Sequence, residues 1–254
     1  MKDSRLLTRR LAIVGGLASV GGLVLARFPK ELELAPTYGN LLRMGDNLTY
    51  AAHRALLPGQ SLAKEYGLRD LTSFPATGTT DPGSGRDAEL AAAYRRLHQG
   101  RFADWRLPVE GRVARPQAFS LAELRQLPSR TQITRHTCEE GWTAIGQWTG
   151  VPLSLILDAA GLMPTARYVV FHSYDDWVDA IDLLDALHPQ TILAYAMNGR
   201  DLPIPHGAPL RLRVERQMGY KSMKFLRRIV VTDQFDDGGE KGNIRNGWAW
   251  YTGI

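Results

Sequence analysis

The sequence predicts an α+β fold that is rich in strands and contains only short helices. Apolar residues occur mostly in short runs or alternations typical of strands, and helical spacing is confined to a few brief segments. Several predicted strands follow one another without an intervening helix, which argues against a regular strand–helix alternation. A chain of 254 residues is long enough to bury a substantial core in one large domain or two small ones.

Helices are predicted where apolar residues recur at helical spacing behind a polar start. In the segment from Ser120 to Leu127, Ser120 and Glu123 have the spacing of a capping box. The segment 86–100 ends at Gly100, a residue typical of helix termini. The predicted helices therefore cover residues 46–57, 86–100, 120–127 and 154–161.

Strands are predicted where β-branched and aromatic residues gather between turn residues. Asn198 and Gly199 form a turn signal between two of them. The predicted strands lie within residues 105–113, 131–138, 167–177, 191–197, 209–214 and 226–233.

Two segments have no regular pattern. Residues 57–85 are dense in Gly, Pro, Ser and Thr, and so long an irregular stretch inside a compact domain is usually functional. The aromatic tail, residues 242–254, is expected to pack back on the domain.

The N-terminus has the features of an export signal. Arg9 and Arg10 directly precede sixteen uncharged residues, and this resembles a twin-arginine signal, which exports folded proteins. We expect residues 1–26 to be this signal and residues 27–254, beginning with a linker, to form a single domain in the periplasm. A short membrane anchor through an uncleaved N-terminus is the alternative, although sixteen residues are few for a span. Residues 1–26 account for three of the five net positive charges, so the rest carries +2 and nucleic-acid binding is not expected.

Cys138 is the only cysteine of the chain, and its surroundings leave several roles open. A hydrolase nucleophile is disfavoured, because Glu139 and Glu140 would raise the pKa of the thiol and no oxyanion-hole motif is present. No second cysteine or spaced histidine pair supports a zinc site. A buried core cysteine and a metal ligand completed by a cofactor remain. Export in the folded state favours the ligand, because a protein that acquires a cofactor before crossing the membrane must fold first.

Four sequence motifs, in the order in which the family has them, resemble the sulfite oxidase-fold family of molybdopterin enzymes. The motifs span residues 135–153, 166–181, 188–214 and 219–231, and the resemblance covers about residues 105–235. It is strongest to the bacterial exported branch that includes a periplasmic methionine sulfoxide reductase. It implies a mixed sulfite oxidase-type molybdopterin-binding fold with a Mo-molybdopterin cofactor.

The resemblance also implies site residues. Cys138 matches the cysteine whose sulfur binds molybdenum, two further sulfurs coming from the pterin dithiolene. Arg211 and Lys224 match cofactor-binding residues, and basic donors suit a pterin phosphate. The other matched cofactor positions are Asp46, Asn47, Thr49, Tyr50, Ser173, His206, Ser222 and Met223. The family motif is only loosely preserved at residues 46–50, and His206 replaces an Asn. Taken alone, Arg211 alternates with two leucines and could face solvent on a strand.

The implied reaction is oxygen-atom transfer at the molybdenum centre, with Cys138, Glu140 and Arg135 as candidate catalytic residues. A carboxylate at Glu140 would repel sulfite and suits a neutral S-oxide or N-oxide, either small or protein-bound. Arg135 and His136 argue for the opposite direction. Without haem or cluster motifs, the chain needs a redox partner, a membrane b-type or a soluble cytochrome. About twenty residues follow the last predicted strand, too few for the dimerisation domain of sulfite oxidases, so a monomer is expected. The alternatives are a sulfite dehydrogenase and a cofactor-free exported binding module.

Overall fold

The computed structural model describes residues 41–254 apart from 58, 60, 237 and 245. The chain divides into two compact units, residues 1–59 and 60–254, and each is described by itself. The predicted export signal and its boundary at residue 26 lie outside the described residues. Within the described part, no helix has the length and apolarity that crossing a membrane would require.

Helix α2, Leu41–Leu56, is the described element of the first unit. It confirms the helix predicted for residues 46–57, and it begins five residues earlier than predicted. His53 and Arg54 lie in its last turn, where basic side chains favourably oppose the negative end of the helix dipole. Asp46, Asn47, Thr49 and Tyr50 all belong to this helix.

Four short α-helices belong to the second unit, and their ends follow the capping signals of the sequence. The Asp87 side chain accepts hydrogen bonds from the backbone N–H groups of Glu89 and Leu90 at the start of α3. Ser120 and Glu123 form the predicted capping box of α4. The helices are α3 (Ala88–Gln99), α4 (Leu121–Gln126), α5 (Leu153–Ala160) and α6 (Leu183–Ala186).

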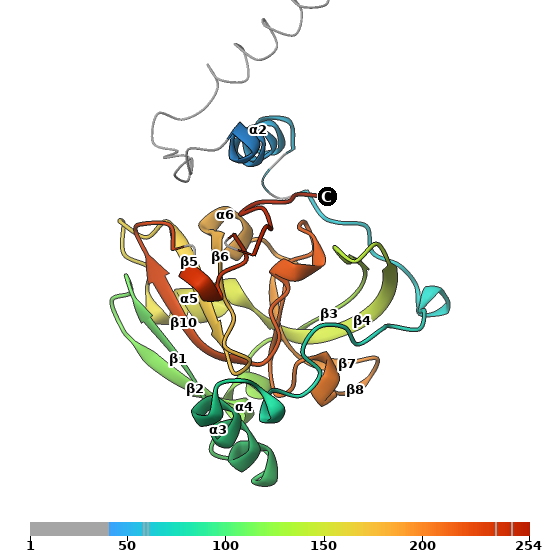
Figure 1. The fold of residues 1–254 in the computed structure, drawn as a ribbon, viewed down its shortest axis with the longest axis vertical. Helices are drawn as coiled ribbons and strands as arrows, with labels where there is room; N and C mark the ends of the chain where they lie inside the picture. Colours follow the sequence, from blue (N-terminus) through green and yellow to red (C-terminus); the bar gives the residue numbers. More distant parts are fainter. Residues whose placement is uncertain (1–40, 58, 60, 237, 245) are drawn as a thin grey trace, which may run out of the picture. The chain divides into compact units, whose positions relative to one another are not determined.

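Two five-stranded sheets form the frame of the second unit (Figure 1). The first has the order β2-β1-β10-β5-β6, and only its β1–β10 pair is parallel. Its strands are β1 (Arg106–Gly111), β2 (Gln117–Ser120), β5 (Tyr168–Ser173), β6 (Val178–Asp182) and β10 (Leu226–Thr232).

The second sheet is antiparallel throughout, with the order β3-β4-β7-β8 and with β9 also paired to β7. Its strands are β3 (Arg130–Thr137), β4 (Thr143–Pro152), β7 (Ile192–Met197), β8 (Arg200–Asp201) and β9 (Arg211–Arg213). Short 3-10 turns occupy Leu68–Asp70, Pro82–Ser84, Ile204–His206, Gly219–Lys221 and Gly239–Lys241. The unit is thus strand-rich with short helices, which confirms the predicted class.

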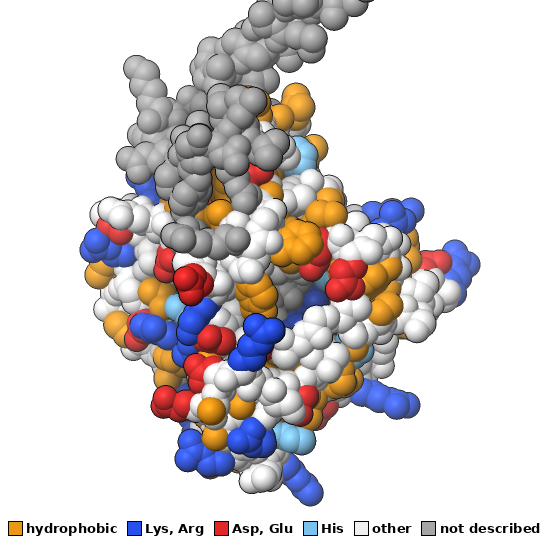
Figure 2. Space-filling view, viewed as in Figure 1, with side chains coloured by type: hydrophobic (Ala, Val, Ile, Leu, Met, Phe, Trp, Pro, Cys, Tyr) orange, Lys and Arg blue, Asp and Glu red, His pale blue; other side chains and the backbone are white. Residues whose placement is uncertain are grey.

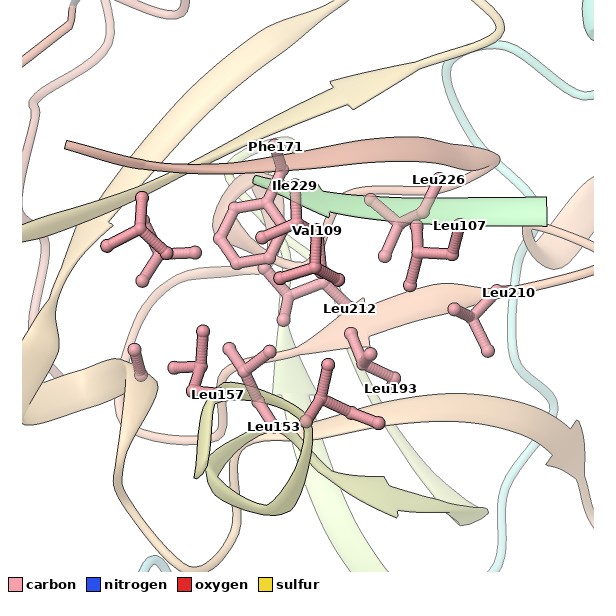
Figure 3. Packing of buried hydrophobic residues seen from close by; sticks show 14 of the residues in the cluster. Leu107, Val109, Leu153, Leu157, Phe171, Leu193, Leu210, Leu212, Leu226 and Ile229 are labelled. Carbon is pink, nitrogen blue, oxygen red and sulfur yellow. The ribbon is translucent and has the colours of Figure 1, made fainter. Parts of the chain in front are cut away.

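The main core lies between the two sheets (Figure 3). Val109 and Phe171 come from the first sheet, Leu193 and Leu212 come from the second, and Leu157 of α5 packs beside them. All five side chains are almost completely buried. Burial of such side chains is the main favourable contribution to folding, at about 1.5–3 kcal/mol for each one fully removed from water.

Strands β2, β4, β6 and β8 had no counterpart among the predicted strands. β4 contains Gly146 and Gly150, which lower its strand propensity, but full pairing with β3 along Thr143–Gly150 fixes it. The predicted packing of the tail is confirmed, because Met218 N donates to Thr252 O at 3.0 Å and the Tyr220 hydroxyl donates to Ala249 O at 2.7 Å.

Candidate active site

A cavity of about 250 Å³ lies where several chain segments of the second unit meet. Cys138 lies directly after β3 at one wall, and Ser222, Met223 and Lys224 precede β10. Further lining residues come from the irregular segment (Thr77, Gly78, Thr79), the turn between β5 and β6 (Asp175, Trp177) and the tail (Asn243, Trp248). The others are His136 in β3, Glu139 and Glu140 after Cys138, Arg211 in β9, and Gly219 and Tyr220 in a 3-10 turn.

A tight turn presents Cys138 to the cavity. The backbone N–H of Cys138 donates to Trp142 O at 2.9 Å, and Gly141 N–H donates back to Cys138 O at 3.1 Å. Gly141 has a φ of 89°, a left-handed conformation that glycine adopts readily. The Cys138 side chain is 4% exposed, and its Sγ lies 3.5 Å from Glu139 Oε2.

Burial raises the pKa of the Cys138 thiol, and the Glu139 carboxylate adds to this rise. The sequence-based expectation for the glutamates is therefore confirmed, and the free thiol is a weak nucleophile at neutral pH. A bound metal cation reverses this balance, because a coordinating thiol is deprotonated. Among the described residues, no group of three or more His, Cys, Asp and Glu side chains is placed to hold a metal ion. A metal at Cys138 would therefore take its other ligands from a cofactor.

Arg211 is a buried cation with a free donor at this cavity. Its residue is 6% exposed, and its Nε has no hydrogen-bond partner among the described residues. Nη1 donates to His206 O at 3.2 Å, and the guanidinium lies 5.2 Å from the centre of the Trp148 ring. Burial, and then the nearby Arg213, lower the pKa of Arg211 to about 9. Because Trp148 and the cavity wall cover this face of β9, Arg211 does not face solvent, although it alternates with leucines as the sequence shows.

Lys224 connects the irregular segment to the cavity wall. Its Nζ donates to the carbonyl oxygens of Thr77 (2.8 Å), Pro205 (3.2 Å) and Thr79. Burial, followed by the charge of Arg211, lowers the pKa of Lys224 to about 8. The segment predicted to be functional from its composition thus lines the cavity, and a lysine that also lines the cavity holds it in place.

These residues fit a molybdopterin cofactor. An unpartnered buried donor costs free energy, and an anionic oxygen next to Arg211 Nε would remove that cost. The thiol of Cys138 supplies one soft ligand, which is the type that molybdenum–dithiolene chemistry needs from the protein. Ser222, Met223 and Lys224 line the same cavity, so the structure brings together six of the sequence-predicted site residues, Cys138, Glu140 and Arg211 included.

A buried polar chain behind the cavity includes His136. Arg213 Nη1 lies 2.8 Å from His136 Nδ1, and Arg213 donates to both carboxylate oxygens of Glu215, from Nε at 3.0 Å and from Nη2 at 2.7 Å. Gln132 Nε2 donates to Glu215 Oε1 at 3.0 Å, and the Arg213 guanidinium lies 4.4 Å from the Trp148 ring centre. Burial and the charge of Arg213 hold the pKa of His136 far below its usual range.

Glu140 lines the cavity as predicted, whereas Arg135 does not line it. Glu140 is exposed, and its Oε2 accepts a hydrogen bond from Trp142 Nε1 at 3.2 Å. Arg135 is exposed on the opposite face of β3 from the buried His136, and its guanidinium lies over the Tyr66 ring. Neighbouring residues of a strand point to opposite faces, so both cannot face the cavity.

Ser173 and His206 lie beside the site without lining this cavity. The Ser173 hydroxyl lies 2.5 Å from Asp175 Oδ1 and 3.0 Å from both Trp177 N and Trp177 O, so it holds the turn that carries two lining residues. His206 packs edge-on against Phe74, and burial followed by Arg211 lowers its pKa to about 4. Asp46, Asn47, Thr49 and Tyr50 belong to the first unit and are described only there.

Several cavity residues were missed from the sequence. Thr77 and Thr79 belong to no motif, and both accept a hydrogen bond from Lys224 through their backbone carbonyls. Asp175 lies in a loop, where burial raises the pKa of its carboxyl group. The alternation of charged and apolar residues in 211–215 could have indicated that Arg213 shares a face with Arg211, but not that the face is buried.

Comparisons with known proteins identify the family of this chain. The model of the oxidoreductase molybdopterin binding domain family matches residues 95–239. "Putative protein-methionine-sulfoxide reductase subunit YedZ1" of Azospira oryzae is 40% identical over 151 residues, which are 59% of this chain and 56% of that protein. The chain thus spans about half the length of this relative.

A solved structure has a similar fold. The crystal structure of the sulfane dehydrogenase SoxCD from Paracoccus pantotrophus matches with a TM-score of 0.50 and 25% sequence identity, covering 52% of this chain and 39% of that one. The predicted sulfite oxidase-type fold is confirmed. The family match covers more than half of the chain, including Cys138, Arg211 and Lys224. The chain therefore belongs to the oxidoreductase molybdopterin-binding domain family, and it is an oxidoreductase whose cofactor is Mo-molybdopterin.

Proposed function

We propose that this protein is an exported oxidoreductase that reduces an S-oxide or N-oxide by oxygen-atom transfer, with electrons from a cytochrome. The observation that carries the proposal is the placement of a single buried thiol, Cys138, in a cavity where carboxylates flank the sulfur and cations lie at the cofactor-binding positions. The bound cofactor supplies the two-electron oxygen-atom chemistry.

The chain's own residues bind the cofactor and handle protons. Cys138 would supply the protein's sulfur ligand to molybdenum, while Arg211 Nε and the 222–224 segment would hold the pterin and its phosphate. Glu140 is exposed at the cavity and is oriented by Trp142. A carboxyl group there can deliver a proton to an oxygen that leaves the substrate as water.

Charge around the thiol favours a neutral substrate. Glu139 and Glu140 would repel the sulfite dianion, whereas an S-oxide carries no net charge. Arg135, which argued for sulfite in the sequence, lies over Tyr66 on the far face of β3. The lining cations Arg211 and Lys224 are the ones assigned to the cofactor, and Lys224 already donates to backbone carbonyls.

The similarity to a protein-methionine-sulfoxide reductase subunit supports an S-oxide substrate, small or protein-bound. Its description as a subunit supports a separate redox partner, which we propose to be a membrane b-type or a soluble cytochrome. Arg9–Arg10 and the following uncharged residues support export to the periplasm. On the face in Figure 2, basic and acidic side chains are interspersed, unlike the basic stripe of nucleic-acid binders.

A sulfite dehydrogenase on the same scaffold is the second candidate. It is favoured by the similarity to SoxCD, which is a dehydrogenase.

The test measures oxide reduction and sulfite oxidation on one preparation of the protein that has been exported and loaded with its molybdenum cofactor. We expect stoichiometric molybdenum, reduction of dimethyl sulfoxide or methionine sulfoxide by a reduced dye, and little sulfite-dependent reduction of cytochrome c. Robust sulfite oxidation without oxide reduction would establish the second candidate instead. Absence of molybdenum from a folded, exported preparation would contradict both and leave a cofactor-free binding module.

A further inference from the structure

The imidazole of His136 is held in one tautomer by its buried neighbours. His136 Nδ1 lies 2.8 Å from Arg213 Nη1, and a guanidinium has only donors, so Nδ1 must accept this hydrogen bond. The neutral ring then carries its proton on Nε2.

Glu215 makes this arrangement neutral overall. It accepts two hydrogen bonds from Arg213, at 3.0 and 2.7 Å, and both side chains are almost fully buried. The charge of the guanidinium is therefore matched within the protein. The network presents an N–H group and no net charge at His136.

The second nitrogen of His136, Nε2, lies beside Gly219, and both residues line the cavity. His136 lies in β3, two residues before Cys138, and both residues line the cavity. Gly219, also a lining residue, packs directly on the ring: a Cβ at this position would lie 2.4 Å from His136 Nε2. The ring centres of Phe74 and Trp142 lie 5.2 and 5.4 Å from the centre of the imidazole ring, and the two side chains restrict its rotation.

We propose that His136 is a substrate-contacting residue whose Nε2–H donates a hydrogen bond to the oxygen of the oxide, with Arg213 and Glu215 as its positioning residues. This inference rests on the proposed function and adds the group that selects the substrate. An S-oxide oxygen is a strong neutral-molecule acceptor, and a fixed neutral donor binds it without the cation that sulfite would require. The absence of a side chain at Gly219 leaves room for the ring to take this position.

Three variants test the contact by activity. His136→Leu removes the donor, and we expect kcat/KM for dimethyl sulfoxide to fall about 10- to 100-fold. His136→Gln, whose amide can accept from Arg213 and donate into the cavity, should recover part of that loss. Gly219→Ala crowds Nε2 and should resemble His136→Leu.

The matched controls are His98→Gln and Gly67→Ala. His98 is exposed on α3, and a Cβ at Gly67 meets only Asp70 Oδ2, at 3.5 Å. Both controls should retain the parent's kcat/KM, and molybdenum content should be equal across the series.

A second measurement reads the tautomer without turnover. In the full chain with its cofactor oxidised, ¹⁵N-histidine NMR should show a neutral ring with the proton on Nε2, in the one signal of six that His136→Leu removes. Dimethyl sulfoxide should shift that Nε2–H signal. In a double variant, Arg213→Met with Glu215→Met, the signal should indicate a mixture of tautomers.

The outcomes separate the inference from the proposed function. An Nδ1–H ring, or a His136→Leu variant with full kcat/KM, would overturn the inference while oxide reduction by the parent chain stands. A parent chain that oxidises sulfite and leaves oxides unchanged would overturn both, and this would be evident before any variant is made.

Discussion

At the residue scale, folding changes the pKa of the Lys224 ammonium group. Burial and Arg211 lower its pKa to about 8 from the ordinary 10.5. Between these two pH values the unfolded chain binds a proton that the folded chain does not, so the free energy of unfolding should rise as pH rises through this window. Below pH 8 both states are protonated and the contribution is at its least favourable.

The measurement is the unfolding free energy of the cofactor-free chain, compared with that of Lys224→Met, at several values across this window. The variant loses the donor to Thr77 and Pro205 and should be less stable throughout. The decisive quantity is the difference between the two curves, which should grow with pH. Parallel curves would show that Lys224 titrates at its ordinary pKa in the folded chain.

The sequence predicted individual cavity residues only where a side chain belonged to a long motif. Cys138, Arg211 and Lys224 were found in this way. Arg213 and Glu215 were not, because their importance comes from burial against Trp148 and His136, which lie on other strands. Thr77 and Thr79 accept from Lys224 through backbone carbonyls, for which no residue type gives a signal.

At the scale of elements, the pairing of β4 with β7 requires a glycine at position 150. A Cβ on Gly150 would lie 2.1 Å from Leu193 O and 2.6 Å from Ala194 Cα, and the β4–β7 register shifts between Thr149 and Gly150. Backbone atoms cannot rotate away as side chains do. We therefore expect Gly150→Ala to lower the free energy of unfolding by about 1–3 kcal/mol, as overpacking typically does.

Denaturant unfolding of this variant is to be compared with Gly67→Ala. Gly67 has ordinary van der Waals space and a φ of −91°, so its substitution should change stability by no more than about 0.5 kcal/mol. Equal stability of the two variants would contradict the packing of β4 on β7.

Elements with local signals were predicted well, and those fixed by distant partners were not. The Ser120–Glu123 capping box and the Gly100 terminus are local, and both predicted helices form there. β6 consists of Val178–Asp182, with two acidic residues among five, yet it is buried because β5 pairs along its length. Its sequence alone gives no alternation that would separate it from a loop.

At the scale of the whole molecule, the cofactor should act as a part of the second unit's structure. The cavity contains a buried guanidinium with an unpartnered Nε and a buried thiol of raised pKa. A bound cofactor would satisfy both, because its anionic oxygens would accept from the guanidinium and its metal would bind the sulfur. A ligand that binds only the folded chain stabilises it by mass action. We expect the loaded chain to unfold at a higher temperature than the same chain produced without molybdenum.

Calorimetry of the two preparations checks this expectation, with Arg211→Leu as the third sample. The variant should show a smaller gain on loading, because it lacks the buried donor. An unfolding temperature that is identical with and without cofactor would contradict the assignment of this cavity.

The class of the whole fold was predictable because the short apolar runs typical of strands and the order of the motifs can be read directly from the sequence. The pairing of β1 with β10 and the separation into two sheets were not, because they join segments more than a hundred residues apart. The same holds for the cavity, whose lining residues range from Thr77 to Trp248 and are brought together only by the tertiary fold.

The central claim is that Cys138 is the protein's ligand to molybdenum, and X-ray absorption at the molybdenum edge tests it most directly. Cys138→Ser should keep the fold, since the side chain's hydrogen bond among the described residues is to the neighbouring Glu139. Its molybdenum should show one fewer sulfur ligand than the parent, and oxide reduction should be abolished. An unchanged sulfur count with full turnover in the folded variant would contradict the claim.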